Sequence, residues 1–300
     1  MSNLKTWISA FRLRTLPLSV SGIIVASSLA EYNGDFNWAT FVFAILTTLS
    51  FQILSNIAND YGDGIKGADN QDRIGPERAI QSGKIKPEHM LYAIRTTILI
   101  SLALAFVLIL VSFGLTKFFL ALIFFILGIL SVYAAINYTV GSNPYGYRGL
   151  GDIFVFVFFG LVSVVGCYVL YAKTVDHVVF LPACTIGLLS AAVLNLNNMR
   201  DIESDRAAGK NTLAVYLGLK RSKSYHIAII SLAIVLSALF GILYYVSSWN
   251  LIYFVMYIPL LLHLKRVVSI KDPKAFDPEL KVIALSTFAL SVLLAIGHLL

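Results

Sequence analysis

Three observations predict that this sequence forms an all-α membrane protein, a bundle of about nine transmembrane helices. First, 58% of its 300 residues are hydrophobic and only 13% are charged, whereas about a quarter of a typical soluble domain is charged. Second, nine apolar segments approach or exceed the roughly 20 residues that a helix needs to cross a bilayer. Third, basic residues gather in alternate connections between these segments, as they do in multi-pass membrane proteins.

Each predicted span is an apolar run bounded by charged or turn-forming residues. In chain order the spans are 15–31, 38–58, 89–112, 117–138, 151–172, 177–199, 224–247, 250–265 and 281–299. They leave no stretch long enough for a separate soluble domain, so we expect residues 1–300 to form a single integral-membrane domain. Residues 4–14 have an amphipathic pattern, which predicts a segment lying in the membrane interface.

The distribution of charge predicts how the protein is oriented. If the N-terminus lies inside, 20 of the 23 lysines and arginines fall at the inner face, and only Lys117 and Lys173 fall at the outer face. This satisfies the positive-inside rule and predicts an inside N-terminus. Because the basic residues are divided among loops between spans, the net charge of +7 indicates contact with membrane lipid and no nucleic-acid partner.

Two similar polar stretches follow the second and sixth spans. Residues 56–70 read NIANDYGDGIKGADN, and residues 195–212 read NLNNMRDIESDRAAGKNT. We call them the first and second motifs. Each begins with asparagines at positions i and i+3, continues with acidic residues and leads into a basic loop at the inner face. Their separation of about 140 residues corresponds to four spans, which suggests two related halves whose motifs face each other.

The carboxylates of each motif have the spacing of one helix face. Asp60 and Asp63 are three positions apart, and Asp201 and Asp205 are four positions apart. Like charges at these spacings destabilise a helix, and a cation between them would remove that repulsion. Oxygen ligands suit Mg²⁺, which takes one or two carboxylates together with substrate phosphates. We therefore predict a magnesium site at these four carboxylates, with nearby amide oxygens from Asn59 and Asn198.

The basic residues around the two motifs predict a diphosphate ligand. A single acidic cluster at a membrane surface is commonly a solvated helix end, but two clusters at matching helix ends favour function. Arginine and lysine side chains would balance the remaining phosphate charge. The predicted phosphate ligands are Lys66, Arg73, Arg78, Arg200 and Lys210. The diphosphate is either a free ion in a pump or the head of a lipid lying among the spans.

The two motifs resemble the signatures of the UbiA superfamily of intramembrane aromatic prenyltransferases. The resemblance extends to the nine-span layout. The run YGYRGLGDIFVFVFFG at residues 145–160 is similar to the superfamily branch that prenylates 1,4-dihydroxy-2-naphthoate in menaquinone biosynthesis. One position departs from the general pattern, which has another aspartate four residues after Asp63. Gly67 stands there instead, and the roles of the next acids, Asp69 and Asp72, are left open.

The resemblance implies a reaction between a polyprenyl diphosphate and 1,4-dihydroxy-2-naphthoate, with loss of CO₂ and diphosphate, in a bacterial inner membrane. It implies that the four carboxylates hold Mg²⁺ against the prenyl diphosphate and act as the catalytic group together with Asn59. An apolar bundle would shield the allylic cation from water, and aromatic rings would stabilise it. Tyr138 and Tyr147 are candidates for such contacts, and Arg148 is a candidate for binding the acceptor's carboxylate.

Two alternatives remain open at this point. A related prenyltransferase acting on another aromatic acceptor, such as 4-hydroxybenzoate, would use the same chemistry at the donor. A secondary transporter also combines two related halves with polar motifs, but transporter sites lie near the bilayer midplane, whereas these acids lie at one end of their spans. The sequence has neither an HExxH zinc motif nor a GxxxxGK[ST] phosphate loop.

Overall fold

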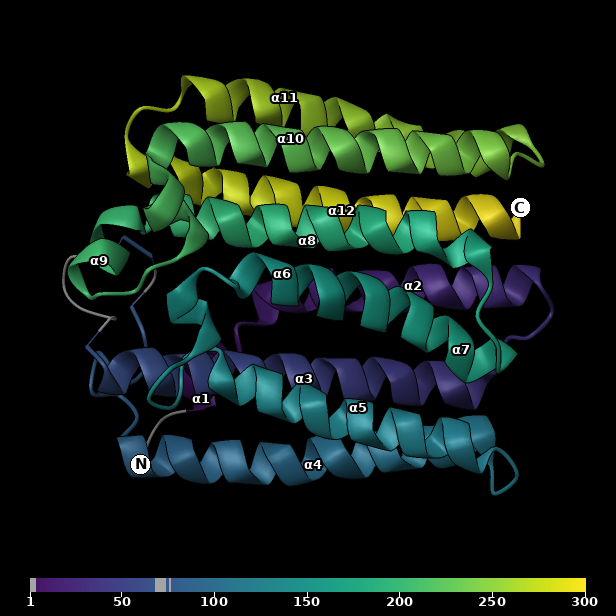
Figure 1. Ribbon diagram of the computed structural model, residues 1–300, viewed down its shortest axis with the longest axis horizontal. Coiled ribbons are helices and arrows are strands. Elements are labelled where there is room, and N and C mark those ends of the chain that lie inside the picture. Colours follow the sequence, from purple (N-terminus) through teal and green to yellow (C-terminus); the bar gives the residue numbers. More distant parts are fainter. Residues whose placement is uncertain (1–3, 68–73, 76) are drawn as a thin grey trace.

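The computed structural model describes residues 4–67, 74–75 and 77–300. Long helices lie side by side in one bundle (Figure 1). Within the described residues, nine helical segments are long and apolar enough to cross a membrane, which confirms the predicted fold class. We call the end of the bundle at which α3 and α8 end the motif end; α9 lies there, at the left of Figure 1.

The first part of the chain contributes the helices up to the middle of the bundle. Their bounds are α1 Leu4–Phe11, η1 Leu13–Thr15, α2 Leu16–Tyr32, α3 Trp38–Ile65, α4 Pro87–Phe113, α5 Phe118–Asn137, η2 Tyr145–Arg148, α6 Gly151–Val155, η3 Phe156–Gly166 and α7 Cys167–Ala172. Several begin at residues that favour helix starts, since Asn37 caps α3 and prolines stand in the first turns of α2 and α4.

The second part of the chain forms the other side of the bundle. Its elements are η4 His177–Val179, α8 Phe180–Arg200, α9 Ile202–Ala207, α10 Leu213–Leu243, η5 Ser248–Met256, α11 Tyr257–Ser269, η6 Pro273–Phe276 and α12 Asp277–Leu299. The seventh span therefore begins at Leu213, eleven residues before its predicted start at 224. The prediction stopped at the basic residues 220–223, whereas the helix continues through them across a kink at Gly218, where φ is 71°.

Helices from the two parts of the chain meet around α2 and η3. In Figure 1, α3, α4 and α5 lie on one side, while α8, α10, α11 and α12 lie on the other. Between them, α2 packs against α3, η3 and α12, and η3 also packs against α8. The contact between η3 and α8 depends on two glycines, because a Cβ on Gly160 would lie 2.8 Å from Cα of Gly187. This close packing forms one wall of the central cavity described below.

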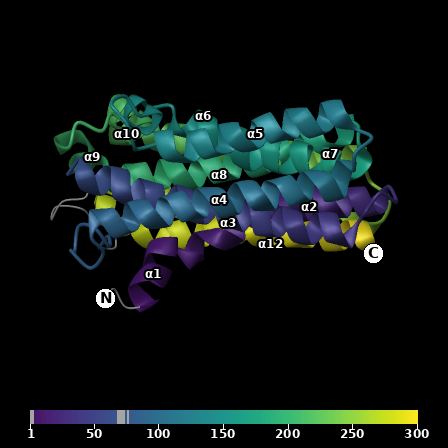
Figure 2. The same cartoon turned by 90° about the horizontal axis from the view of Figure 1, so that it is seen from below.

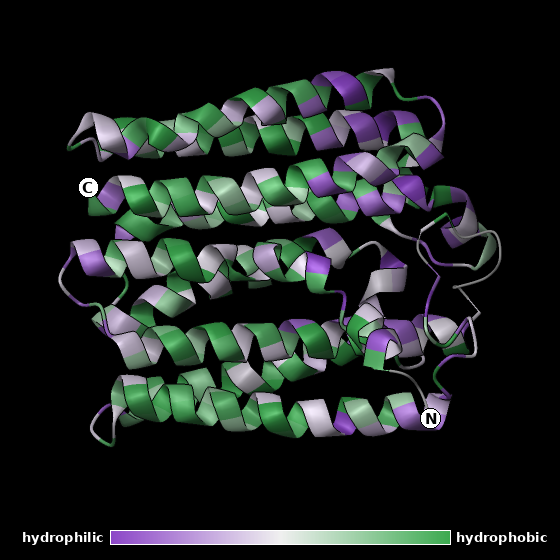
Figure 3. Cartoon of the chain, turned by 180° about the vertical axis from the view of Figure 1, so that it is seen from behind, coloured by the Kyte–Doolittle hydropathy of each residue, from purple (hydrophilic) through white to green (hydrophobic). Residues whose placement is uncertain are grey.

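The surface of the bundle matches a lipid environment. Apolar residues cover most of the helix lengths, and hydrophilic residues concentrate at the motif end (Figure 3). Large apolar side chains such as Phe119 and Leu99 are exposed on the outside of α5 and α4. The amphipathic segment predicted at residues 4–14 forms α1 and η1, and α1 leaves the bundle at an angle (Figure 2). The protein is therefore an integral membrane protein with a short helix beside its motif end.

Candidate active site

A central cavity of about 810 Å³ extends from the motif end into the apolar interior of the bundle. Its polar end is lined by Arg78 and by residues of both motifs: Asn59, Asp63, Asn198, Asp201, Asp205 and Lys210. The adjoining wall is aromatic and contains Tyr138, Tyr145, Phe154, Phe158 and Phe159. Further from the motifs the lining is mainly aliphatic, with residues such as Ile109 and Leu170. The cavity can therefore hold a molecule with a charged head and a long apolar tail.

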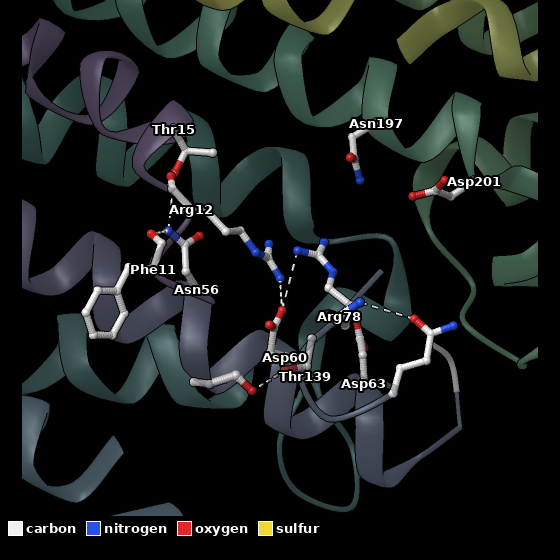
Figure 4. A network of polar contacts seen from close by, with 12 residues as sticks. Phe11, Arg12, Thr15, Asn56, Asp60, Asp63, Arg78, Thr139, Asn197 and Asp201 are labelled. Carbon is white, nitrogen blue, oxygen red and sulfur yellow. Dashed lines mark hydrogen bonds and ion pairs between the residues drawn. The ribbon is translucent and has the colours of Figure 1, made fainter. Parts of the chain in front are cut away.

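Asp60 and Asp63 of the first motif lie on the last two turns of α3, which continues beyond the apolar span. Asp60 is buried and forms ion pairs with Arg12 and with Arg78, whose Nη1 lies 3.4 Å from Oδ1 of Asp60. Figure 4 shows both guanidinium groups converging on this carboxylate. Arg12 stands between α1 and η1 with φ at 52°, a left-handed conformation that is uncommon outside glycine. Asp60 lines a second cavity of about 260 Å³, on the other side of these arginines from the central one.

The second motif contains a break between two helices. Asp201 ends α8 and precedes α9, with backbone angles outside the helical range. The backbone N–H of Asp205 still donates to the carbonyl of Asp201 at 2.9 Å, so the two acids are one helical turn apart, as predicted. Arg200 donates to both carboxylate oxygens of Asp201, at 2.8 and 2.7 Å. This carboxylate is therefore held by the residue that precedes it in the chain.

Lys210 joins the two motifs. Its ammonium donates to Oδ2 of Asp63 at 2.9 Å and lies 4.0 Å from Oδ1 of Asp205. Tyr147 donates its hydroxyl to the other oxygen of Asp63 at 2.8 Å, and its ring lies 5.4 Å from the same ammonium. Asp63 on α3 and Asp205 on α9 thus share one buried cation. The two motifs face each other across this cation, as the internal repeat predicted.

Burial and charge together set the protonation states around Lys210. Burial alone would lower the pKa of Lys210, but the carboxylates of Asp63 and Asp205 outweigh it and raise this pKa above its ordinary value. Burial raises the pKa of Tyr138 to about 12. Burial and the nearby Asp63 carboxylate also raise the pKa of the Tyr147 phenol. Lys210 is therefore a permanent cation at physiological pH, while both tyrosines are neutral.

The structure brings together most of the predicted site residues, but not all of them. Asn59, Asn198, Arg78 and Tyr138 line the cavity with the acids and Lys210, whereas Asp60 lies behind Arg12 and Arg78. Four other predicted ligands do not line this cavity: Lys66, Tyr147, Arg148 and Arg200. Arg148 is exposed, and the ammonium of Lys66 lies over the ring of Tyr147. Arg73, Asp69 and Asp72 lie outside the described residues.

Several polar residues of the cavity were not predicted as site residues, and three of them contact the motifs or belong to one. Arg12 was counted only as an inner-face charge, Asn197 is the neighbour of a predicted amide, and Asp277 comes from the start of α12. Asn197 carried a signal, because it belongs to the asparagine run of the second motif. Arg12 and Asp277 belong to neither motif, and only the fold brings them to the site.

The polar end of the cavity suits a hard divalent cation. Among the described residues, no three His, Cys, Asp or Glu side chains converge on one point, because the four predicted carboxylates are turned toward Arg12, Arg78, Arg200 and Lys210. The donors present are nevertheless carboxylate and amide oxygens, the ligands that Mg²⁺ prefers. The buried Oδ1 of Asn59 accepts no hydrogen bond from the described part of the chain. That oxygen is available as a ligand in a cavity that already holds one cation between carboxylates.

Sequence comparisons identify relatives that match nearly the whole chain. The model of the UbiA prenyltransferase family matches residues 19–292. The chain is 42% identical to a protein of Escherichia coli (strain K12) named 1,4-dihydroxy-2-naphthoate octaprenyltransferase, over 99% of this chain and 96% of that one. It is 41% identical to the protein of the same name from Haemophilus influenzae, with the same coverage. A relative in Mycobacterium tuberculosis with this name is 36% identical over 79% of the chain.

Solved structures with the same fold are more distant in sequence. A UbiA homologue from Aeropyrum pernix has a TM-score of 0.70 and 16% identity, with 96% of this chain and 98% of that chain covered. A UbiA homologue from Archaeoglobus fulgidus, bound to DMAPP and Mg²⁺, has a TM-score of 0.67 and 13% identity, with 97% and 99% covered. These likenesses show that the fold is shared.

Proposed function

The chain belongs to the UbiA prenyltransferase family, and we propose that it transfers a polyprenyl group from a polyprenyl diphosphate to 1,4-dihydroxy-2-naphthoate. The observation that carries this proposal is the meeting of two acidic motifs at the polar mouth of one long apolar cavity. Full-length relatives named for this acceptor and for an octaprenyl donor support it. The alkylated product would be demethylmenaquinone in its hydroquinone form.

The polar end of the cavity would bind the donor's diphosphate together with Mg²⁺. We propose that Asp63, Asp201 and Asp205 hold the metal, with Asp60 joining them as the donor's phosphates draw away Arg12 and Arg78. The homologue bound to DMAPP and Mg²⁺ supports metal use in this fold. When bound, Mg²⁺ would neutralise negative charge on the diphosphate. Lys210 and Arg78 would bind the remaining phosphate oxygens, since both line the cavity.

The chain's own residues would then control the reaction. Breaking the C–O bond leaves its electron pair on the diphosphate and an allylic cation on the prenyl group. The apolar cavity wall excludes water from this cation, and the rings of Tyr138, Tyr145 and Phe154 can stabilise it by their π faces. The acceptor's carboxyl-bearing carbon attacks the cation, and CO₂ departs and returns its bonding electrons to the ring. Both hydroxyl groups of the acceptor are retained.

The acceptor's own carboxylate also needs a cation. Arg148 was predicted for this role from the sequence, but it is exposed and does not line the cavity. Lys281, on the first turns of α12, does line it. We therefore propose Lys281 as a candidate beside Arg148, and comparing Lys281→Met with Arg148→Met would separate them. The variant with a raised KM for the acceptor, and an unchanged KM for the donor, would identify the ligand.

The experiment that tests this function uses membranes containing the protein. They would be incubated with octaprenyl diphosphate, Mg²⁺ and 1,4-dihydroxy-2-naphthoate, and the products would be identified by mass spectrometry. A prenylated, decarboxylated product that disappears with EDTA is expected. Product formed only from 4-hydroxybenzoate would overturn the acceptor, and no product from any aromatic acceptor would overturn the reaction. Membranes with Asp201→Asn are the matched control.

We propose that the protein lies in the bacterial cytoplasmic membrane with its motif end inside. The positive-inside pattern supports this orientation. Each part of the proposed donor would then reach the site from the side on which it belongs, the diphosphate head from the cytoplasm and the prenyl tail from the bilayer. Labelling of single cysteines introduced at Lys86 and Lys117, at opposite ends of the bundle, tests it. Inner-face protection of Lys86 and outer-face labelling of Lys117 are expected.

A further inference from the structure

The second motif contains an arginine whose hydrogen-bonding groups are occupied within the protein. Arg200 is 1% exposed. Its Nε and Nη2 donate to the two oxygens of Asp201, and Nη2 also donates to Oδ1 of Asn197 at 2.9 Å. Its Nη1 donates to Oδ1 of Asp277 at 2.6 Å. Four of its five N–H groups therefore donate to protein oxygens, and Arg200 does not line the central cavity, so we assign it to protein carboxylates instead of to a phosphate group.

The carboxylate that Arg200 holds lies at a point where the backbone gives little support. Asp201 lies between α8 and α9, with φ at −96° and ψ at 14°. A side chain at such a junction has no continuous helix to restrict it on both sides. The two parallel hydrogen bonds from Arg200 fix both the position and the plane of the carboxylate. Asp201 also lines the central cavity.

Asp277 in turn fixes the arginine. It is the first residue of α12, 77 positions away from Arg200 in the chain, and its side chain is about half exposed, at 47%. The start of α12 is itself held in place two residues later, where Glu279 accepts from Arg266 and lies 2.6 Å from Nδ1 of His263 on α11. The last helix of the chain therefore sets the position of Arg200 from outside the motif.

We infer that Arg200 and Asp277 are positioning residues, through which α12 holds the Asp201 carboxylate ready for a divalent cation. This inference rests on the proposed function, because it assigns a role within the same site. The charges support it. Asp201 and Asp277 share the single guanidinium of Arg200, so neutralising Asp277 would remove one negative charge from beside the Asp201 carboxylate. Asp277 thus affects both the position of the Asp201 carboxylate and the charge around it, because the two residues share Arg200.

A double-mutant cycle of Asp277→Asn and Arg200→Lys tests this inference. The readouts are the Mg²⁺ concentration for half-maximal turnover, the KM of each substrate, and the rise in Tm of detergent-solubilised protein on addition of Mg²⁺ and inorganic diphosphate. We expect Asp277→Asn to raise the Mg²⁺ requirement about tenfold, which corresponds to about 1.4 kcal/mol, and to reduce the Tm rise. The KM of the aromatic acceptor should not change. Glu203→Gln, which removes an exposed carboxylate of α9, is the matched control and should behave as the parent.

The decisive result is the effect of Asp277→Asn when Arg200 is already lysine. If Asp277 acts through Arg200, the second substitution adds little, because contacting residues in one network are not additive. Full additivity would show that Asp277 touches the ligand directly and would overturn the inference, as would a parental Mg²⁺ requirement in Asp277→Asn alone. If Arg200→Lys does not accumulate, Asp277→Glu replaces it. An Mg²⁺ requirement of Asp277→Glu within about threefold of the parent's supports a role for the charge and the hydrogen bond. An Mg²⁺ requirement raised as much as in Asp277→Asn contradicts that role.

The Tm measurement separates this inference from the proposed function. It needs only Mg²⁺ and inorganic diphosphate, so it reports on the metal and phosphate site even if the acceptor has been assigned wrongly. A wild-type protein that responds to these ligands but makes no prenylated naphthoate would overturn the proposed acceptor and leave the positioning role standing. The Tm in EDTA, measured for each variant, shows whether the fold itself has been weakened.

Discussion

The two acidic motifs look alike in sequence but are supported in different ways. Asp60 and Asp63 of the first lie on one continuous helix, and they pair with cations from elsewhere: Arg12, Arg78 and Lys210. The second lies across a break between α8 and α9, and its first carboxylate pairs with the adjacent Arg200. The first motif thus depends on distant segments for its charge balance. Among the described residues, the second pairs with Arg200 and Lys210 of its own sequence, and Arg200 in turn pairs with Asp277 of α12.

This difference shows how a repeated motif can serve two purposes. The cations of the first motif come from a surface helix, a loop and the opposite motif, so a ligand that attracts them can draw them away separately. The cation of the second motif is buried and surrounded by acceptors. Removing a partner from such a buried group is costly, so this pair should stay in place. We infer that the first motif rearranges around the donor while the second remains a fixed reference.

The largest expected effect comes from removing one carboxylate of each motif. Asp63→Asn and Asp201→Asn should each lower kcat by at least about a hundredfold, the scale of losing a group that stabilises developing charge. If both motifs serve one metal and diphosphate site, the two losses should be similar. Initial rates in membranes with matched protein levels check this. Near-normal turnover of either variant would show that its motif does not take part.

Lys210→Met should have the next largest effect, and the effect should differ between free and liganded protein. Without this cation, Asp63 is left buried and uncompensated, which costs about 3–5 kcal/mol for a buried pair. We expect a lower Tm in EDTA and partial recovery with Mg²⁺, because the metal restores positive charge. Lys66→Met removes an exposed ammonium near Tyr147 and is the matched control. Equal Tm losses with and without Mg²⁺ would show that the metal does not replace the positive charge of Lys210 beside Asp63.

Replacing Lys210 by histidine should make diphosphate binding depend on pH. The pKa of Lys210 is raised, so its contribution is fully present below the unfolded pKa of about 10.4 and is lost only as pH rises through the higher folded value. A histidine has an ordinary pKa near 6.5, so its charge is lost around neutrality. Between pH 6 and 8.5, the Tm rise caused by diphosphate should fall in Lys210→His, while Lys210 should cause no such fall in the parent. Parallel profiles would contradict a cationic role.

Arg12→Gln tests the long-range support of the first motif. It removes one of two arginines from Asp60 and should raise the KM of the prenyl diphosphate about tenfold, the scale of one hydrogen bond to a charged group. The KM of the acceptor is the internal control. A larger loss in kcat than in donor affinity would show that Arg12 acts in the chemical step. Arg14→Gln, two positions further along the chain and also in the cavity lining, shows whether the loss is specific to the partner of Asp60.

Tyr147→Phe should have the smallest effect. It removes one hydrogen bond to Asp63 and leaves the ring beside Lys210, so a loss of about 1 kcal/mol, or roughly fivefold in donor affinity, is expected. Tyr147→Leu also removes the ring and should lose more. Titration of inorganic diphosphate by thermal shift measures both. An unchanged diphosphate affinity in both variants would mean that the contacts of Tyr147 with Asp63 and Lys210 do not contribute to diphosphate binding.

Much of the fold was readable from the sequence because membrane spans are long apolar runs with a strict length requirement. The predicted start of the seventh span was wrong because Lys220, Arg221 and Lys223 look like a loop in the sequence, whereas they belong to α10. The second motif could be predicted as a cluster, since Arg200 and Lys210, which contact its carboxylates, stand beside them in the sequence. Arg12 and Asp277 were not readable as site residues, because only the packing of α1, α3, α8 and α12 brings them to the acids. Local spacing predicts a helix face, and it does not predict which distant residue the face will meet.

The pairing of Arg200 with α12 has a consequence for how the protein is made. The ribosome delivers α8 to the membrane 77 positions before Asp277, so the buried guanidinium enters the bundle ahead of one of its acceptors. The second motif cannot reach its final arrangement until the last helix has been synthesised and inserted. The polar end of the cavity is therefore complete only when the polypeptide is complete, and nascent chains halted before α12 should remain inactive.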